Sequence, residues 1–329
     1  MAPPLNDLAS VFKELGDLER DFAQVEIDAL RRKEYSLRPL YSKRETLFKR
    51  VPDFWPTVFG SGPEEIRSFF TPDDLPLLAA IESFSVERYQ IQSETEGEPR
   101  SLRFKFQFGP NEFMTDTTLV KDFEFRAAED GPGDLISKPV PIKWKGKKKD
   151  LTRGLLDAAV ELYEAEEALK LKNGDKVVNI VDREALWQYE KLRLNLEKDE
   201  NDDHQPSFFS WFGFRGTVDA EKPEKPKKSS GNGAAEESKD EEDESEDEEL
   251  EEMLDVEIFP AGAEVATAMA EDLWPDAMDY FISAGQEEDD FEFDSDEDEE
   301  EDDDEAPELV LAEDEDDNDG RQRKRPRNG

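Results

Sequence analysis

The sequence of 329 residues contains no cysteine and a single histidine, His204. The first absence excludes disulfides, thiolate nucleophiles and every cysteine-ligated zinc or iron–sulfur site. One histidine, in the polar stretch KDENDDHQP, leaves almost no means of building a Ser-His-Asp triad or a multi-histidine metal centre. We therefore expect no catalytic site and no metal site of these kinds.

Long apolar runs and glycine-rich phosphate loops are also missing. The sequence has no run of about 18 apolar residues, the length needed to span a bilayer. The N-terminal MAPPLNDLAS lacks the basic and apolar regions of a signal peptide. Gly60 and Gly62 stand outside any GxGxxG framework, and the basic GKKKD at 146–150 lacks the flanking residues of a phosphate-binding lysine. The acidic runs have no EF-hand spacing. These absences predict a soluble, intracellular, non-enzymatic protein without a cofactor.

Positive charge is scarce, because 42 Lys and Arg residues face 87 Asp and Glu, giving a formal charge of −45. Residues 1–218 carry −9 of it and residues 219–329 carry −36. A field of this sign repels bare nucleic acid and anionic lipid, so we expect no membrane binding and no strong direct nucleic-acid binding. A flexible polyanion binds polycations, of which histones come first and ribosomal proteins second. An acidic tail that only maintains solubility is the alternative.

Apolar residues recur every three to four positions near the start of the chain and predict a dimerisation helix over residues 1–51. Its seam consists of Leu8, Val11, Leu15, Leu18, Phe22 and Val25. A helix this long suggests a second helix beside it, most simply from a second copy of the chain. An intramolecular hairpin is the alternative. Pro39 is expected to kink or break the helix.

The main folded domain is expected over residues 52–218 and is of the α+β class. Four segments alternate apolar and polar residues within about 84–145 and predict an antiparallel sheet with one face covered by helices. They are SVERYQIQSE, SLRFKFQFG, TLVKDFEFRA and PVPIKWK. A short helix is expected over Asp74–Phe84, and further helices over about 151–200 with a break at Asn173–Gly174. SFFSWFGF, with five aromatics in eight residues, is expected to be buried in the core.

The last third alternates between acidic tracts and one apolar segment. Residues 219–263 and 286–329 are too charged to bury a core and are expected to be mostly disordered. Residues 264–285 show helical apolar spacing and are expected to pack back on the domain, a free amphipathic segment being the alternative. The terminal basic cluster predicts a nuclear localisation signal, with shuttling to the cytoplasm left open; folding onto the acidic tract as a counterion is the alternative. It comprises Arg321, Arg323, Lys324, Arg325 and Arg327.

Four aromatic-rich stretches precede the acidic tail in a fixed order. They are VPDFWPTVF (51–59), PIKWKGKKKDLT (141–152), PSFFSWF (206–212) and EDLWPDAMDYF (271–281). Together they resemble the nucleosome assembly protein family, and most closely its SET/template-activating-factor branch. LRPLYSKRETLF (37–48) is similar to the end of the dimerisation helix of that branch, which also carries a proline. The helical stretch of residues 155–200 and the acidic insert near 220–253 are longer than the segments between the same motifs in that branch.

The resemblance implies a headphone-shaped homodimer, in which long helices pair antiparallel and an "earmuff" of sheet and helices stands at each end. It also implies a non-enzymatic histone chaperone that binds core histones through the acidic underside of the earmuff and the acidic tails. The candidate histone-binding residues are Asp272, Asp276, Asp279, Glu287, Glu288, Asp289 and Asp290. Core positions are expected for Phe54, Trp55, Phe208, Phe209, Trp211 and Trp274.

The same resemblance allows a second interpretation. The protein would be a regulatory binding protein that inhibits or redirects a phosphatase or a histone-modifying enzyme, such as a histone acetyltransferase. The preference between H3–H4 and H2A–H2B stays open at this point.

Overall fold

The computed structural model describes residues 5–127, 133–174, 178, 180–201, 204–216 and 256–294. The chain divides into two units, residues 1–286 and residues 287–329. All described elements belong to the first unit, except the end of the last helix, α10 (Ala277–Asp294), which belongs to the second.

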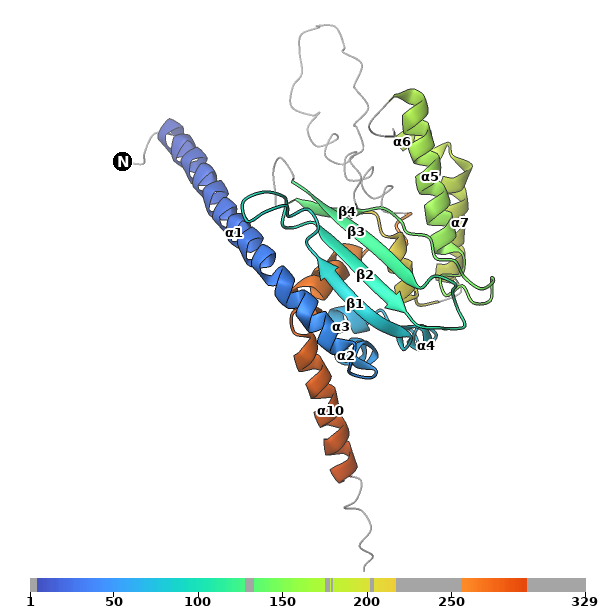
Figure 1. Ribbon diagram of the computed structural model, residues 1–329. Coiled ribbons are helices and arrows are strands. Elements are labelled where there is room, and N and C mark those ends of the chain that lie inside the picture. Colours follow the sequence, from blue (N-terminus) through green and yellow to red (C-terminus); the bar gives the residue numbers. More distant parts are fainter. Residues whose placement is uncertain are drawn as a thin grey trace, which may run out of the picture. The chain divides into compact units, whose positions relative to one another are not determined.

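The first element, α1 (Leu5–Phe48), is one uninterrupted helix (Figure 1). Pro39 lies inside it and does not break it, although a proline removes one intrahelical hydrogen bond. The guanidinium groups of Arg38 and Arg44, on either side of the proline, donate to backbone carbonyls of other elements at 2.7 to 3.1 Å. These contacts hold both flanks of Pro39 against the domain, which explains why the helix continues.

Four strands form an antiparallel sheet in the order β1-β2-β3-β4 (Figure 1). Their bounds are Ile81–Glu87 for β1, Leu102–Phe108 for β2, Thr118–Arg126 for β3 and Asp134–Ser137 for β4. The long helix and the four-stranded sheet confirm the predicted α+β class.

Three local predictions were wrong. The first strand is Ile81–Glu87 rather than SVERYQIQSE, of which only residues 85–87 are strand, because the chain turns after Arg88. The fourth strand is Asp134–Ser137 rather than PVPIKWK, where prolines lack the N–H that a ladder needs and only Trp144 forms an isolated bridge, to Met114. The helix expected over Asp74–Phe84 is reduced to α4 (Leu75–Leu78), because β1 already begins at Ile81.

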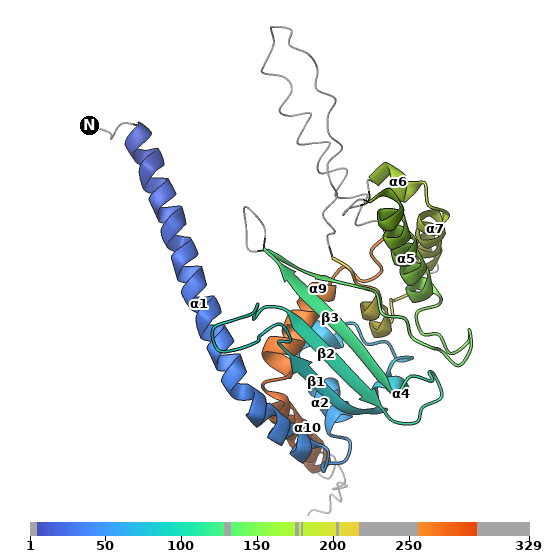
Figure 2. The same cartoon turned by 45° about the horizontal axis from the view of Figure 1, so that its top comes forward.

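Short helices surround the sheet, and a helical hairpin follows it. The first group consists of α2 (Phe54–Ser61), α3 (Glu64–Arg67), the 3₁₀ turn η1 (Phe208–Gly213), α9 (Gly262–Ala268) and the π-helical turn η2 (Met269–Leu273). Helix α9 lies behind the sheet in both views (Figures 1 and 2). The hairpin consists of α5 (Leu155–Asn173), α6 (Ile180–Glu184) and α7 (Trp187–Asn201).

Aromatic side chains fill the space between the sheet and the helices. Phe104 and Phe123, from adjacent strands, both have ring centroids 5.3 Å from that of Trp211 in η1. The SFFSWFGF segment is therefore buried in the core, as predicted. The six motif aromatics expected in the core, Phe54, Trp55, Phe208, Phe209, Trp211 and Trp274, are all buried.

The chain rejoins the core earlier than the sequence suggested. Val256, Ile258 and Phe259 are buried, so the insert predicted over 219–263 ends before residue 256. Within the segment predicted to pack back on the domain, residues 264–285, apolar residues of α9 and η2 are buried. Along α10 the apolar residues leave the core, and Met278 and Ile282 are about half exposed.

Four charged residues are buried in the described structure, Asp74, Lys121, Glu166 and Arg215. The Lys121 ammonium, on the apolar face of β3, donates to the carbonyls of Lys138, Phe212 and Phe214 at 2.9 to 3.1 Å. These bonds join β3 to the residues after β4 and to the end of η1. The carboxylate of Glu166, in α5, is another of these buried charges.

Glu166 accepts hydrogen bonds from Arg183 at 2.7 Å and from Arg215 at 2.6 Å. These two arginines lie in α6 and just after η1, so one carboxylate connects the helical hairpin to the core. Burial raises the pKa of Glu166, but the charges and hydrogen bonds of the two arginines outweigh it and hold that pKa below its usual value.

Candidate functional site

A hollow of about 540 Å³ is lined by four carboxylates and by no lysine or arginine. The carboxylates come from four separate elements, Glu65 of α3, Asp134 of β4, Glu264 of α9 and Asp272 of η2. The remaining lining residues are apolar or small. We call these four residues the acidic hollow.

In the part of the chain that the structure describes, no cation lines the acidic hollow. Glu65, Asp134 and Glu264 are exposed, and no ion pair to them occurs among the described residues. Asp272 accepts the hydroxyl of Tyr280 at 2.5 Å. Burial raises the pKa of Tyr280, and Asp272, Asp276 and Glu65 raise it further, as expected where several negative charges converge on one hydroxyl.

The three predicted aspartates follow one side of the helical segment that borders the hollow. The amide of Asp276 donates to the carbonyl of Asp272 at 3.1 Å, and the amide of Asp279 donates to the carbonyl of Asp276 at 2.9 Å. Asp272 joins the acidic hollow, whereas Asp276 and Asp279 are exposed outside its lining. The structure therefore brings only one of the three into the hollow.

Sequence reasoning did not single out Glu65, Asp134 or Glu264. Each is one of 87 acidic residues, and they are far apart in the sequence. No periodicity or motif marks them, and only the packing of α3 and α9 near β4 brings them together. Glu287, Glu288, Asp289 and Asp290 lie in the part of α10 whose side chains are not described. The basic cluster at 321–327 lies outside the described residues.

The predicted dimerisation residues lie on an unpacked helical surface. Every residue from Ser10 to Glu26 is exposed, including the apolar seam of Val11, Leu15, Leu18, Phe22 and Val25 at 47% to 65%. The side chain of Leu8 is outside the described part. A helix with no packing partner is only marginally stable in water, so this half of α1 lacks the contacts that normally stabilise a helix.

The carboxylates are spread over a surface rather than gathered around one point. Across the described ranges, no group of three or more Asp, Glu or His residues is arranged to hold a metal ion. Within the same ranges, no helix is long and apolar enough to cross a membrane. A dispersed set of unpaired carboxylates is suited to a partner that carries many positive charges.

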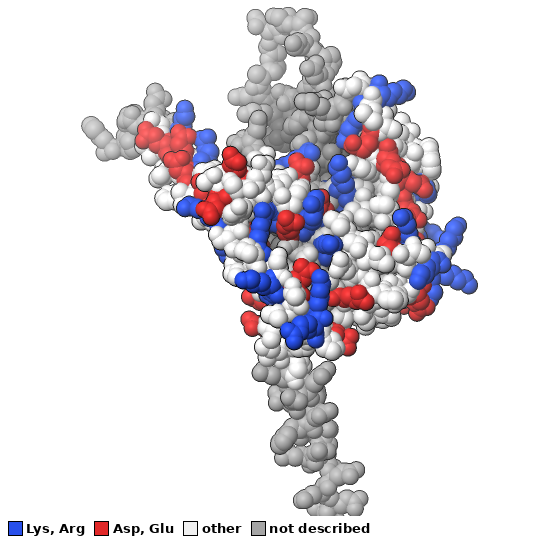
Figure 3. All heavy atoms as spheres, viewed as in Figure 1, with Lys and Arg blue, Asp and Glu red and all other residues white. Residues whose placement is uncertain are grey.

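Another face of the molecule is electrostatically different. In Figure 3 basic and acidic side chains are interspersed. On the outer side of the sheet, for example, Arg103 forms two hydrogen bonds of 2.7 Å to Asp122 of the next strand. Opposite charges compensate there, whereas those of the acidic hollow remain uncompensated.

The fold and the hollow define an α+β binding protein with a long helix and an uncompensated acidic surface. The family model of the nucleosome assembly protein (NAP) matches residues 17–284. The chain belongs to the nucleosome assembly protein family, as the aromatic motifs predicted.

Curated relatives from three kingdoms match part of the chain. A putative nucleosome assembly protein of Schizosaccharomyces pombe is 34% identical over 152 residues, covering 43% of this chain and 60% of that protein. NAP1-related protein 2 of Arabidopsis thaliana is 28% identical, covering 50% and 66%. Protein SET of Drosophila melanogaster is 32% identical, covering 41% and 53%. The chain thus spans between half and two thirds of the length of these relatives.

Solved structures share the fold. A crystal structure of a Ccp1 mutant superimposes with a TM-score of 0.51 at 24% identity, covering 86% of this chain and 99% of that one. A crystal structure of Vps75 gives a TM-score of 0.50 at 18% identity, covering 84% and 99%. At these identities the likeness supports the arrangement of long helix, sheet and helices alone.

Proposed function

We propose that this protein is a histone chaperone that binds core histones through the acidic hollow and the aspartates beside it. The observation that carries the proposal is a hollow lined by four carboxylates and no cation. Membership of the nucleosome assembly protein family supports it, because the names of the relatives refer to nucleosome assembly or to SET. Core histones are strongly basic proteins, so their charge complements this surface.

The mechanism is charge shielding rather than catalysis. Unpaired carboxylates occupy the lysines and arginines that would otherwise bind DNA phosphates non-specifically. DNA, a denser polyanion, takes the histones over when they can form an ordered complex. The acidic residues after α10 add charge to the same task, and the basic cluster at 321–327 directs the protein to the nucleus.

A homodimer is the second part of the proposal. The apolar seam on α1 pairs with the same seam of a second copy, which removes five exposed apolar side chains per chain from water. Antiparallel pairing around the middle of the seam places Leu8 of one helix near Val25 of the other. The dimer then presents two acidic hollows to one histone assembly.

Neutralising the hollow tests the proposed site. The triple variant Glu65→Gln, Asp134→Asn, Glu264→Gln changes only exposed side chains, so it should fold normally. Three lost contacts between partly exposed charges weaken binding by about three- to thirtyfold. Affinity for H3–H4 and for H2A–H2B is measured by fluorescence anisotropy at near-physiological salt, and the comparison gives the histone preference.

The matched control is Glu94→Gln, Glu184→Gln, Glu197→Gln. These residues are also exposed and lie outside the hollow, and the variant has the same change of net charge. Equal loss of affinity in the two triple variants would assign binding to overall charge and refute the hollow as the site. Wild-type protein that binds neither histone pair would refute the proposed function itself.

A further inference from the structure

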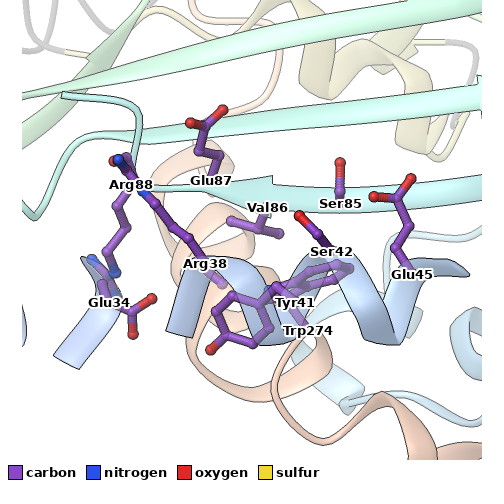
Figure 4. Close-up of a pocket in the computed structure, with 11 residues that line it drawn as sticks. Glu34, Arg38, Tyr41, Ser42, Glu45, Ser85, Val86, Glu87, Arg88 and Trp274 are labelled. Carbon is purple, nitrogen blue, oxygen red and sulfur yellow. The ribbon is translucent and has the colours of Figure 1, made fainter. Parts of the chain in front are cut away.

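A cavity of about 330 Å³ separates the second half of α1 from the strand β1 (Figure 4). It is lined by residues of α1 between Glu34 and Glu45, by Ser85–Arg88, and by Trp274 of the C-terminal segment. We call this cavity the edge groove.

The edge groove follows the open edge of the sheet. β1 pairs only with β2, and alternate residues of an outer antiparallel strand point their N–H and C=O groups away from the sheet. In the described part of the chain, no backbone hydrogen bond reaches residues 82–87 from the side of α1. The opposite edge is covered, because Ser137 of β4 donates to the carbonyl of Arg215 at 2.8 Å. An open edge beside a cavity can accept an extended peptide as an added strand.

The charges in the groove favour a cationic occupant. Glu34 and Glu87 line it, and no ion pair or hydrogen bond to their carboxylates occurs among the described residues. The two lining arginines are already engaged. Arg38 donates to the carbonyls of Arg88 and Ile91 at 3.1 and 2.8 Å, and Arg88 donates to that of Pro99 at 2.7 Å. With Glu45, the lining carries three carboxylates against two arginines, a net charge of −1, and the carboxylates of Glu34 and Glu87 are its unpaired acceptors among the described residues.

Trp274 and Tyr41 give the groove an aromatic lining. Trp274 is only 4% exposed, and its indole N–H has no hydrogen-bond partner in the described structure. That nitrogen is itself enclosed, so Trp274 presents its ring to the groove rather than its N–H. The ring of Tyr41 lies 5.6 Å from that of Trp274, so the groove has an aromatic wall against which the methylenes of lysine or arginine can pack.

We propose that the edge groove binds an extended peptide rich in lysine and arginine, which adds as a strand to β1 and places cationic side chains against Glu34 and Glu87. The proposal rests on the proposed function and adds to it a site for the unfolded tail of a basic protein, separate from the acidic hollow. The groove-lining part of α1 begins at Glu34, beyond the seam that ends at Val25, so dimer pairing leaves the groove open.

The charge test uses the full-length protein and a fluorescein-labelled, unstructured peptide rich in lysine and arginine. The double variant Glu34→Gln, Glu87→Gln should weaken peptide binding about three- to tenfold, the size expected for two partly exposed charge contacts. The matched control Glu184→Gln, Glu197→Gln removes the same charge from the helical hairpin and should leave the affinity within twofold. Equal effects in the two variants would overturn the proposal, because the long-range field alone would then explain binding.

Substitutions at Ser42 test whether the groove prefers a positively charged peptide. This exposed residue of α1 lines the groove, so Ser42→Arg should weaken peptide binding and Ser42→Glu should strengthen it. The same substitutions at Ser36, which is exposed on the same helix outside the groove lining, are the controls and should have little effect. Strand addition itself predicts that a peptide N-methylated at alternate residues binds more weakly than its unmethylated form. Equal affinity of the two peptides would refute pairing with β1.

Binding of tailless histones, measured in parallel, separates this proposal from the proposed function. Loss of peptide binding with intact binding of tailless histones supports the edge groove as the tail site. Normal histone binding with peptide binding unaffected by the groove variants would overturn the groove and leave the histone chaperone function standing. Concentration-dependent assembly beyond a dimer, abolished by Ser42→Arg, would identify a second copy as the occupant and also overturn the proposal.

Discussion

The carboxylate of Glu166 and the ammonium of Lys121 show how single residues hold this domain together. Both lie in segments whose apolar spacing was recognised from the sequence, and neither was singled out as a buried charge. Glu166 is the only anion between Arg183 and Arg215, and all three side chains are at least 87% buried. A buried pair is costly to break, because removing one partner leaves an uncompensated charge.

Glu166→Gln should therefore lower the free energy of unfolding by about 3–5 kcal/mol. Glu161→Gln is the control, since Glu161 also lies in α5 and pairs with Lys191 of α7, but that ion pair is about 40% exposed. Its loss should cost less than about 1 kcal/mol. Urea denaturation monitored by tryptophan fluorescence measures both values. Equal costs would show that the Glu166 cluster contributes no more than a surface pair.

Lys121 gives a prediction about pH. Burial lowers the pKa of Lys121 from 10.5 to about 7, with the charges of Glu257 and Asp122 acting in the opposite direction. Between these two values the unfolded chain binds the proton and the folded chain does not, so stability gains from this residue as the pH rises.

The difference in free energy of unfolding between the wild type and Lys121→Met should accordingly increase from pH 7 to pH 10.5, by at most about 1.4 kcal/mol per pH unit. It should be flat below pH 7. Urea titrations at a series of pH values provide the measurement. A difference that stays constant up to pH 10 would mean that the three carbonyls keep the ammonium charged.

At the scale of elements, α1 consists of two halves with different roles. The second half is fastened to the domain by arginines that donate to backbone carbonyls, while every residue of Ser10–Glu26 is exposed in the described structure. The sequence predicted the whole helix and its seam from spacing alone. It did not predict that Pro39 would be tolerated, because that depends on contacts with residues far away in the chain.

Leu15→Glu with Phe22→Glu should abolish dimerisation, because four like charges would then face each other across the paired seams. Light scattering should show a monomer in place of a dimer. Leu40→Glu with Leu47→Glu is the control, since both leucines are exposed on the same helix outside the seam, and it should remain dimeric. A wild-type monomer would contradict the proposed assembly.

At the scale of the whole molecule, charge is distributed in two ways. Among the described residues the acidic hollow is lined by carboxylates without a cation, whereas the outer side of the sheet carries mixed charge. Most of the net −36 of residues 219–329 lies outside the described ranges. Binding that depends on such charges weakens as salt screens them.

Histone affinity should fall steeply between low and high salt, and a chain truncated after residue 286 should show a shallower salt dependence, since fewer charges contribute. Titrations of both proteins at several ionic strengths provide the comparison. Identical salt dependence would show that the residues after 286 do not take part in binding.

The sequence by itself determined the family, the α+β class, the long helix and the aromatic core, because periodicity and ordered aromatic motifs are local signals. It misplaced β1, β4 and the point at which the chain rejoins the core, since strand pairing and burial depend on partners distant in sequence. The acidic hollow and the edge groove were decided only by the tertiary structure. Their carboxylates are ordinary members of an acidic sequence, and only packing determines which of them face a common space without a cation.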